Sequence, residues 1–492
     1  MLLRGRFHRG ESGILLHISS LPSRHGIGSL GIEAYNFVDF LKKSRQRLWQ
    51  ILPLVPVGEG NSPYKSPSCF AGEILFIDLD FLVRDGLLEP DEVQAAQFPQ
   101  NVDYDAVREY KIPLLKRAAR RFDTRRADYI KFVRENGTWL DDFAEFSTAS
   151  ECFGCDSILD FPENIRLRMP AAMEDFCAEN ELRINFYKIT QFLFYSQYFA
   201  LKKYAEKNGV KIVGDIPFYV SLDSADVWKS PESFKLGRDM TPTLVAGVPP
   251  DIFSSSGQLW GNPIYDWEHH RKTDYAWWKR RLAHCKNLYD IIRIDHFRAF
   301  ASYYTIIYGA PDAKSGTWEK GVGLSFWQSI RKKLGPLAII AEDLGGDEPD
   351  VIKLVNDTGF PNMKILQFAF DGDSDNAHLP KNYDRNCVCY TGTHDNDTVL
   401  GWYSTCPNKE RAVAAQVFPD GSMPIPHKMI SLAMNSRADK VIIPMQDWLC
   451  LGNEARMNTP GTMVGNWQWR LAADMLTDEL AEKIRKISKI RN

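Results

Sequence analysis

Short apolar runs recur along the chain, and segments with helical spacing of apolar residues separate most of them. The runs predict eight β-strands, at 13–20, 48–54, 210–214, 291–294, 337–341, 363–368, 387–390 and 440–444. The segment from Asp274 to Tyr289 predicts an intervening helix, because it places Trp278, Leu282 and Cys285 on one face. Strands that alternate with helices are typically parallel, so we expect a (β/α)8 TIM barrel. The alternative is an open doubly wound sheet, but no Gly-x-Gly-x-x-Gly follows an early strand.

Residues 81–182 interrupt this alternation. They are charged, carry helical patterns punctuated by Pro113, Pro162 and Pro170, and contain no convincing strand. We interpret them as a large, mainly helical subdomain inserted into the barrel, which residues 1–80 and 183–492 would form.

Four of the predicted strands lead into acidic residues. Asp215, Asp295, Glu342 and Asp395 each follow an apolar run within a few residues. Because (β/α)8 barrels gather chemistry at the carboxyl ends of their strands, we expect these side chains on one rim. Arg293 precedes Asp295 by two residues, and its charge would keep that carboxylate deprotonated.

A pair of carboxyl groups on one rim suits the cleavage of an acetal bond between sugars. Retaining cleavage needs a nucleophilic carboxylate and a protonated carboxyl about 5 Å apart. Asp295 suits the nucleophile. Glu342 suits the proton donor, because it follows the apolar residues 339–341 and a dry environment raises a carboxyl pKa. His394 and Asp395 would bind sugar hydroxyls and stabilise the transition state.

More ordinary roles exist for the same residues. Arg293 and Asp295 could form a structural ion pair, and the run 393–397 could ligate a metal ion. No His-Glu-x-x-His motif or His pair at helical spacing supports a catalytic metal. The occurrence of several acids at successive strand ends favours the catalytic interpretation.

Composition and charge narrow the function classes. The net charge of −3 argues against a nucleic-acid partner, and no apolar run is long enough to span a bilayer. The first ten residues contain arginines without an apolar segment behind them, which is unlike a signal peptide. Nine cysteines without a disulfide framework predict free thiols and a cytoplasmic location. We interpret Cys152 and Cys155, the one Cys-x-x-Cys pair, as ordinary thiols.

Several motifs together resemble a known family. The runs RIDH at 293–296, EDLG at 342–345 and THDN at 393–396 resemble signature regions of the α-amylase clan. GDIPFYV at 214–220 is similar to the form found in amylomaltases, the disproportionating enzymes or 4-α-glucanotransferases. The segments 62–64, 246–254, 257–263 and 453–462 resemble that family as well.

The resemblance implies a 4-α-glucanotransferase that moves α-1,4-glucan segments between malto-oligosaccharides by a retaining double displacement. Asp295 would be the nucleophile, Glu342 the acid/base and Asp395 the third catalytic carboxylate. Residues 246–267 would form an active-site loop that overhangs the cleft. The implied substrate-binding residues are Tyr64, Asp215, Arg293, His296, His394, Phe253, Gln258, Trp260 and Asn466.

The resemblance further implies that no organic cofactor and no metal is used. The expected partners are malto-oligosaccharide and α-glucan donors and acceptors, without nucleic acid or membrane. Two other functions stay open at this point. One is a retaining α-glucan hydrolase, which differs in letting water reach the glycosyl-enzyme before a sugar does. The other is a non-catalytic glycan-binding barrel, which would have no need of three acids.

Overall fold

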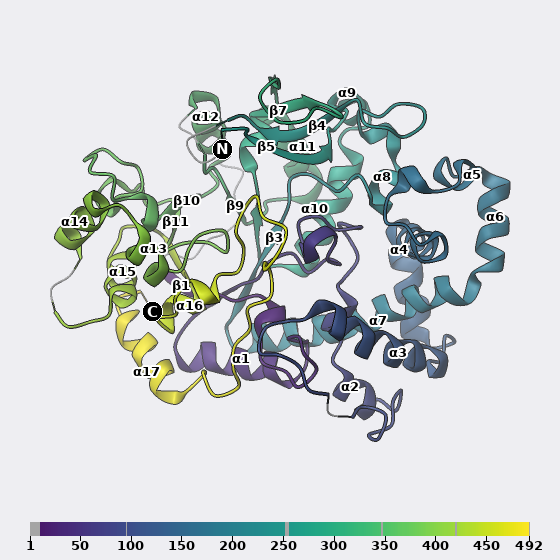
Figure 1. Cartoon of the computed structure of the whole chain (residues 1–492), viewed down its shortest axis with the longest axis horizontal. Helices are drawn as coiled ribbons and strands as arrows, with labels where there is room; N and C mark the ends of the chain where they lie inside the picture. Colours follow the sequence, from purple (N-terminus) through teal and green to yellow (C-terminus); the bar gives the residue numbers. More distant parts are fainter. Residues whose placement is uncertain (1–9, 95, 251–254, 346–347, 419–420, 492) are drawn as a thin grey trace.

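Eight parallel strands close into a barrel at the centre of the molecule (Figure 1). The computed structural model describes residues 10–94, 96–250, 255–345, 348–418 and 421–491. In spatial order the barrel runs β1-β12-β11-β10-β9-β6-β3-β2. The strands are β1 (Glu11–Leu15), β2 (Leu48–Gln50), β3 (Lys211–Ile216), β6 (Ile291–Ile294), β9 (Ile339–Ala341), β10 (Asn362–Ile365), β11 (Cys387–Tyr390) and β12 (Lys440–Pro444). Each overlaps one of the eight predicted runs, so the predicted (β/α)8 barrel is confirmed.

Helices cover the barrel and connect most of its strands. In α10 (Ala276–Leu288) the face with Trp278, Leu282 and Cys285 is buried, as its spacing predicted. The other helices of this part of the chain are α1 (Ile32–Lys43), α7 (Glu181–Lys207), α8 (Ala225–Lys229), α9 (Trp267–Lys272), α11 (Gly323–Leu334), α12 (Pro349–Thr358), α13 (Val399–Thr405), α14 (Asn408–Val417), α15 (Ile425–Met434), α16 (Met445–Trp448) and α17 (Asp478–Ile487). The link between β10 and β11 contains only short 3-10 turns.

Residues 81–182 contain helices joined by turns and loops, and no strand in the part that the structure describes, as predicted. They include most of α2 (Leu79–Arg84), all of α3 (Tyr104–Arg121), α4 (Ala127–Phe153), α5 (Glu163–Arg166) and α6 (Pro170–Glu179), and the start of α7. Figure 1 shows these helices at the right and lower right, with α4 packed along α7. Phe192 of α7 contacts the rings of Phe122, Tyr129 and Phe132, with centroids 5.4 to 5.6 Å apart. These aromatic contacts therefore attach the inserted helices to α7, the helix that leads directly into β3.

A second, antiparallel sheet lies above the barrel in Figure 1, with the order β5-β4-β7-β8. Its strands are β4 (Leu244–Val248), β5 (Gln258–Pro263), β7 (Ser302–Ile307) and β8 (Thr317–Lys320). The segment 246–267 was predicted as an overhanging active-site loop; residues 246–248 and 258–263 of it are strands, and α9 begins at its last residue. β5 has the sequence QLWGNP, in which apolar and polar residues do not alternate as they do in a typical half-buried strand, and only its last residue is buried.

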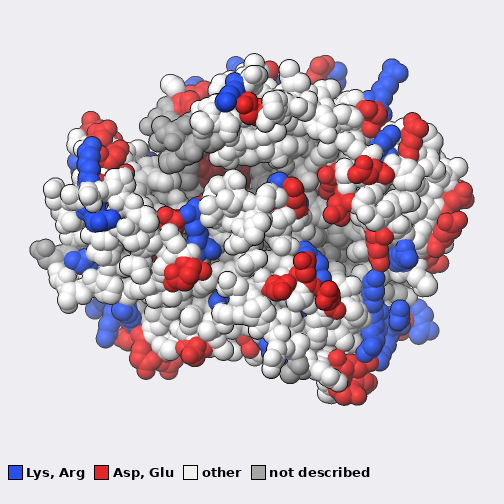
Figure 2. Space-filling model, viewed as in Figure 1, with Lys and Arg blue, Asp and Glu red and all other residues white. Residues whose placement is uncertain are grey.

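Two sequence predictions about the whole chain can be compared with the structure. All nine cysteines are free, as predicted. Among the helices in the described part of the chain, none combines the length and apolarity needed to cross a membrane. Figure 2 shows basic and acidic side chains interspersed over the visible face, without a broad basic area of the kind that binds polyanions.

Candidate active site

The floor of the site is an ion pair buried inside the barrel. Asp215 of β3 and Arg293 of β6 are partners in the strand register. Arg293 Nη1 donates to both Asp215 carboxylate oxygens, at 2.7 and 2.6 Å, and both side chains are buried. Each is the second-last residue of its strand. The two charges can be buried there because each neutralises the other through direct hydrogen bonds.

Asp295 lies one residue beyond β6, where the barrel opens. Its Oδ1 is 3.1 Å from Arg293 Nη2, and the side chain keeps 29% of its surface exposed. Burial raises the pKa of Asp295 to about 6, against the opposing pull of Arg293 and with a further rise from Asp215 and Asp395. Arg293 lowers the pKa of Asp295, as expected, but burial outweighs its effect. The group still ionises below neutral pH.

Glu342 lies beside Asp295 at the next strand end. The last register pair between β6 and β9 is Ile294 with Ala341, so Asp295 and Glu342 are the residues that follow on adjacent strands. The Glu342 carboxylate accepts the N–H of His296 at 2.6 Å and that of Leu344 at 2.8 Å. Burial, and then the charge of Asp295, raise the pKa of Glu342 to about 8. The two carboxyls thus titrate at opposite sides of neutral pH.

A third carboxylate, Asp395, comes from the loop after β11. Its Oδ2 is 3.4 Å from His394 Nε2, and its Oδ1 accepts a 2.6 Å hydrogen bond from Asn458 Nδ2. Arg456 Nη2 donates to the Asp395 carbonyl at 2.6 Å, and the Asn458 N–H donates to the His394 carbonyl at 3.0 Å. A segment some sixty residues further along the chain therefore orients this acid.

An aromatic side chain connects these acids to one wall of the site. Tyr64 Oη donates to Asp215 at 3.0 Å, and its ring stacks on His394 with centroids 5.3 Å apart and planes 13° apart. Trp467 adds a tilted ring 5.7 Å from Tyr64. Burial raises the pKa of Tyr64 well above its usual value, so the hydroxyl stays protonated as a donor. Figure 2 shows acidic atoms inside a hollow near the middle of the visible face.

Trp260 of β5 lies beside His296, the residue after Asp295. Its ring contacts His296 edge-on, with centroids 4.8 Å apart, and its Nε1 donates to Gln258 Oε1 at 3.0 Å. His296 has a left-handed backbone, with φ 53°, which aims its N–H at Glu342. Burial lowers the pKa of His296 to about 3, so the ring is neutral. Phe253, predicted to bind substrate from the same loop, lies outside the described residues.

Known proteins of one family resemble this chain over almost its whole length. The family model described as 4-alpha-glucanotransferase matches residues 16–476. The chain belongs to the 4-alpha-glucanotransferase family. It is 43% identical over 482 residues to the 4-alpha-glucanotransferase of Clostridium butyricum, covering 96% of this chain and 99% of that protein. It is 44% identical over 490 residues to that of Streptococcus pneumoniae, covering 98% and 97%.

A solved structure extends the similarity to three dimensions. The amylomaltase of Streptococcus agalactiae, determined in complex with acarbose, superposes with a TM-score of 0.95 at 38% identity. The match covers 99% of each chain. The inserted helices and the second sheet are therefore shared with that amylomaltase and are not additions peculiar to this chain.

Asn466, predicted to bind substrate, has its amide engaged within its own loop. Its Oδ1 accepts the Thr459 N–H at 2.9 Å, and its Nδ2 donates to the Thr462 carbonyl at 2.9 Å. These hydrogen bonds fix the conformation of the segment that follows Asn458. Asn458 itself donates the hydrogen bond that orients Asp395. Sequence reasoning named the runs that contain Arg456 and Asn458 but assigned neither residue a role. Both residues lie in a polar run with Glu454 and Thr459, and this was the sequence feature that could have suggested a role for them in the site.

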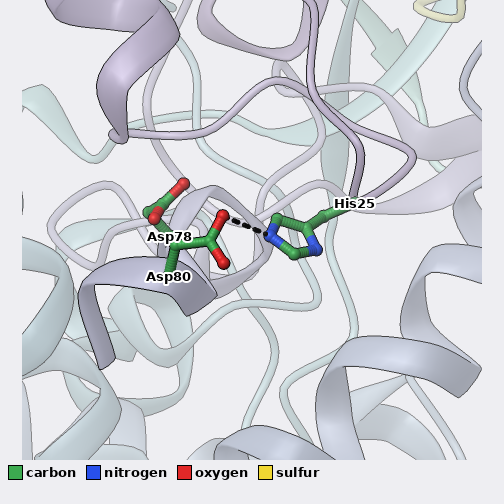
Figure 3. Close-up of side chains that lie close together, drawn as sticks. All are labelled: His25, Asp78 and Asp80. Atoms are coloured by element: carbon green, nitrogen blue, oxygen red, sulfur yellow. Dashed lines mark hydrogen bonds and ion pairs between the residues drawn. The ribbon is translucent and has the colours of Figure 1, made fainter. Parts of the chain in front are cut away.

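Outside the cleft, one group of His, Cys, Asp and Glu side chains in the described part of the chain is compact enough to hold a metal ion. It consists of His25, Asp78 and Asp80. Figure 3 shows the His25 ring directed at Asp80, 3.2 Å from nitrogen to oxygen. Asp80 is also paired with Arg24, and Asp78 accepts from Ser29 at 2.7 Å and from a backbone N–H of α2. The carboxylates are therefore already paired, which favours a structural ion-pair network over a metal site.

Proposed function

We propose that this member of the glucanotransferase family transfers α-1,4-linked glucan segments by retaining double displacement through Asp295. The observation that supports this most directly is the position of Asp295 and Glu342 directly after adjacent parallel strands. Burial raises the pKa of Asp295 to about 6, and burial together with the charge of Asp295 raises that of Glu342 to about 8. Adjacent strands lie about 4.8 Å apart, close to the carboxyl separation of about 5 Å that retaining chemistry requires. At neutral pH one group is an anion and the other an acid.

In the first half-reaction the Asp295 carboxylate attacks the anomeric carbon of the donor. The bond from that carbon to the bridging oxygen breaks, and Glu342 gives its proton to the departing oxygen, which leaves as the 4-hydroxyl of the released sugar. Glu342 becomes a carboxylate at that moment. The N–H groups of His296 and Leu344, already hydrogen-bonded to it, stabilise the new charge without rearrangement.

In the second half-reaction Glu342 acts as the base. The 4-hydroxyl of an acceptor sugar loses its proton to the Glu342 carboxylate while its oxygen attacks the anomeric carbon. The ester bond to Asp295 breaks, and the carboxylate returns to its starting state beside Arg293. Two inversions leave the anomeric configuration unchanged.

The other carboxylate and its neighbours hold the sugar. Asp395 has one oxygen bound by Asn458 and the other near His394, so it presents a fixed anion to ring hydroxyls. Tyr64, stacked against His394, offers an aromatic surface to the sugar that is cleaved. Trp260 and Gln258 would contact the chain on the other side of the scissile bond, and the roles of Phe253 and Asn466 stay predictions.

The product pattern from maltotriose tests this function. A transferase yields glucose and a ladder of longer chains while the total number of reducing ends stays constant. A steady rise in reducing ends would instead indicate the hydrolase, and binding without any new product would indicate a glycan-binding barrel. Because water is present at about 55 M, transfer also requires that the site bind an acceptor sugar well. The acarbose bound by the Streptococcus agalactiae amylomaltase makes acarbose a suitable competing ligand.

A further inference from the structure

An exposed tryptophan lies on the edge strand of the second sheet. Trp318 of β8 keeps 45% of its surface exposed, which is unusual for a side chain with so large an apolar area. The sheet register pairs it with Tyr304 of β7, and the two rings meet edge-to-face with centroids 5.3 Å apart. Tyr304 itself is buried and fixed by a hydrogen bond from its hydroxyl to the Ala313 carbonyl at 2.9 Å.

A buried arginine holds the indole from the protein side. The Arg298 guanidinium carbon lies 4.5 Å from the centre of the Trp318 ring system. A cation in this position is attracted to the ring face and limits its rotation. One part of the indole is therefore covered and oriented by protein, while the remainder is open. This is the arrangement of a rigid stacking surface.

The same arginine joins this surface to the two catalytic segments. Arg298 follows Asp295 by three residues and donates to the Gly345 carbonyl at 3.2 Å and to Glu348 at 2.9 Å. Gly345 and Glu348 belong to the segment that begins at Glu342. Trp318 is thus held, through Arg298, beside the segment that carries Glu342, the predicted proton donor.

A second exposed apolar side chain lies on the same face of this sheet. Leu259, also 45% exposed, is opposite Gly247, which is opposite Tyr304, which is opposite Trp318. Residues directly opposite each other in antiparallel strands project from the same face. The Ile306 side chain fills the space beside Gly247, and Tyr304 is buried, so Leu259 and Trp318 are separate exposed side chains on this face of the sheet.

We propose that Trp318 is a stacking platform for a glucosyl ring of the acceptor or leaving-group part of an α-glucan, away from the cleaved bond. This inference rests on the proposed function. The apolar C–H face of a glucose ring packs against an indole face, and neither partner loses hydrogen bonds to water. The platform would favour longer glucans over short ones, because a short chain that fills the catalytic centre does not reach it.

Binding measured without turnover tests the platform. Titration calorimetry would measure the affinities of the Asp295→Asn protein for maltoheptaose and for maltose. The same measurements on the Asp295→Asn/Trp318→Ala double variant would then be compared with them. We expect maltoheptaose to bind about tenfold more weakly after the substitution, a change equivalent to about 1.4 kcal/mol, with maltose unchanged. Trp318→Phe, which keeps a ring over Arg298, should lose less than about threefold.

Two results would contradict the platform. Unchanged maltoheptaose binding in the double variant would remove Trp318 from the glucan site. An equal loss for both sugars would show that Trp318 acts only by supporting Arg298 and the catalytic segments. Phe199→Ala on α7 is the matched control, an aromatic of similar exposure at 42% that packs on Tyr195 away from the cleft, and it should change neither affinity.

The results also distinguish failure of the platform proposal from failure of the proposed function. Absence of maltoheptaose binding by the Asp295→Asn protein itself would contradict both. Normal binding by that protein, together with a maltotriose ladder from the unmodified enzyme and no effect of Trp318→Ala, would contradict the platform alone.

Discussion

The three acids of the cleft are held in two different ways. Asp295 and Glu342 follow adjacent barrel strands and are fixed by the barrel itself, through strand register and the backbone N–H groups of the segments that carry them. Asp395 is fixed from outside, by the side chains of Arg456 and Asn458. Groups that exchange protons and form a covalent bond are thus built on the rigid framework. The group that only grips hydroxyls depends on a distant segment.

This difference predicts that the barrel-held pair dominates catalysis. Replacing Asp295 by Asn should lower turnover by roughly 10³-fold or more, equivalent to about 4 kcal/mol of barrier, because no comparable nucleophile remains. Initial rates of maltotriose disproportionation would measure it, with sugar binding largely retained. Asp290→Asn, at the other end of the same strand and bound to the Ile212 N–H, is the control and should cost less than about threefold. A loss below tenfold at Asp295 would exclude it as the nucleophile.

The second acid should show a loss that depends on the substrate. Glu342→Gln should slow maltotriose turnover on the order of 10²- to 10⁴-fold, since no proton reaches the departing oxygen. A glycosyl fluoride needs little protonation, so the variant should form the intermediate from it at a nearly normal rate. The control is Asp343→Asn, a neighbouring acid that accepts from Asn362 and the Met363 N–H. Equal impairment on both substrates would argue against Glu342 as the proton donor.

The pKa values of the same pair set the pH dependence. Asp295, with a pKa raised to about 6, must be ionised to attack, so kcat/KM should rise with pH up to about 6. Glu342, with a pKa raised to about 8, must be protonated, so kcat/KM should fall above about 8. Each limb should approach a tenfold change per pH unit. The alkaline limb should vanish in Glu342→Gln with a glycosyl fluoride donor, and its persistence would assign that limb to another group.

Loss of a residue that supports Asp395 should lower activity less than replacement of Asp295 or Glu342. Asn458→Ala removes the 2.6 Å bond to Asp395 but leaves the carboxylate in place, so we expect kcat/KM to fall about tenfold. Asn435→Ala, which removes an exposed amide bonded within α15, should have no effect. A loss as large as that of Asp295→Asn would mean that the two modes of support do not differ in importance.

The same contrast explains what sequence could predict. The barrel strands are short apolar runs whose neighbours repeat the pattern, and the acids directly after them share a rim by geometry alone. Asp295 and Glu342 were accessible in this way. Arg456 and Asn458 were not, because their contacts with the loop after β11 depend on how the chain returns over the barrel. No local periodicity encodes such a return.

The second sheet escaped prediction for another reason. β7, with the sequence SYYTII, has the composition of a strand, but it follows a barrel strand where the alternation called for a helix. β5 mixes Gln, Gly, Asn and Pro with two apolar residues, and pairs with β4 through an irregular register. Its Trp260 was named through family resemblance. Trp318, on the strand beyond β7, was missed.

Direct observation of the covalent intermediate tests the central claim, that Asp295 and Glu342 act on one glycosidic bond. The Glu342→Gln variant would be incubated with α-maltotriosyl fluoride, digested and analysed by peptide mass spectrometry. The fluoride leaves without an acid while transfer lacks its base, so a glycosyl ester should accumulate on the peptide that contains Asp295. Sugar on any other peptide, or fluoride release without an adduct and without slowed transfer, would contradict the account.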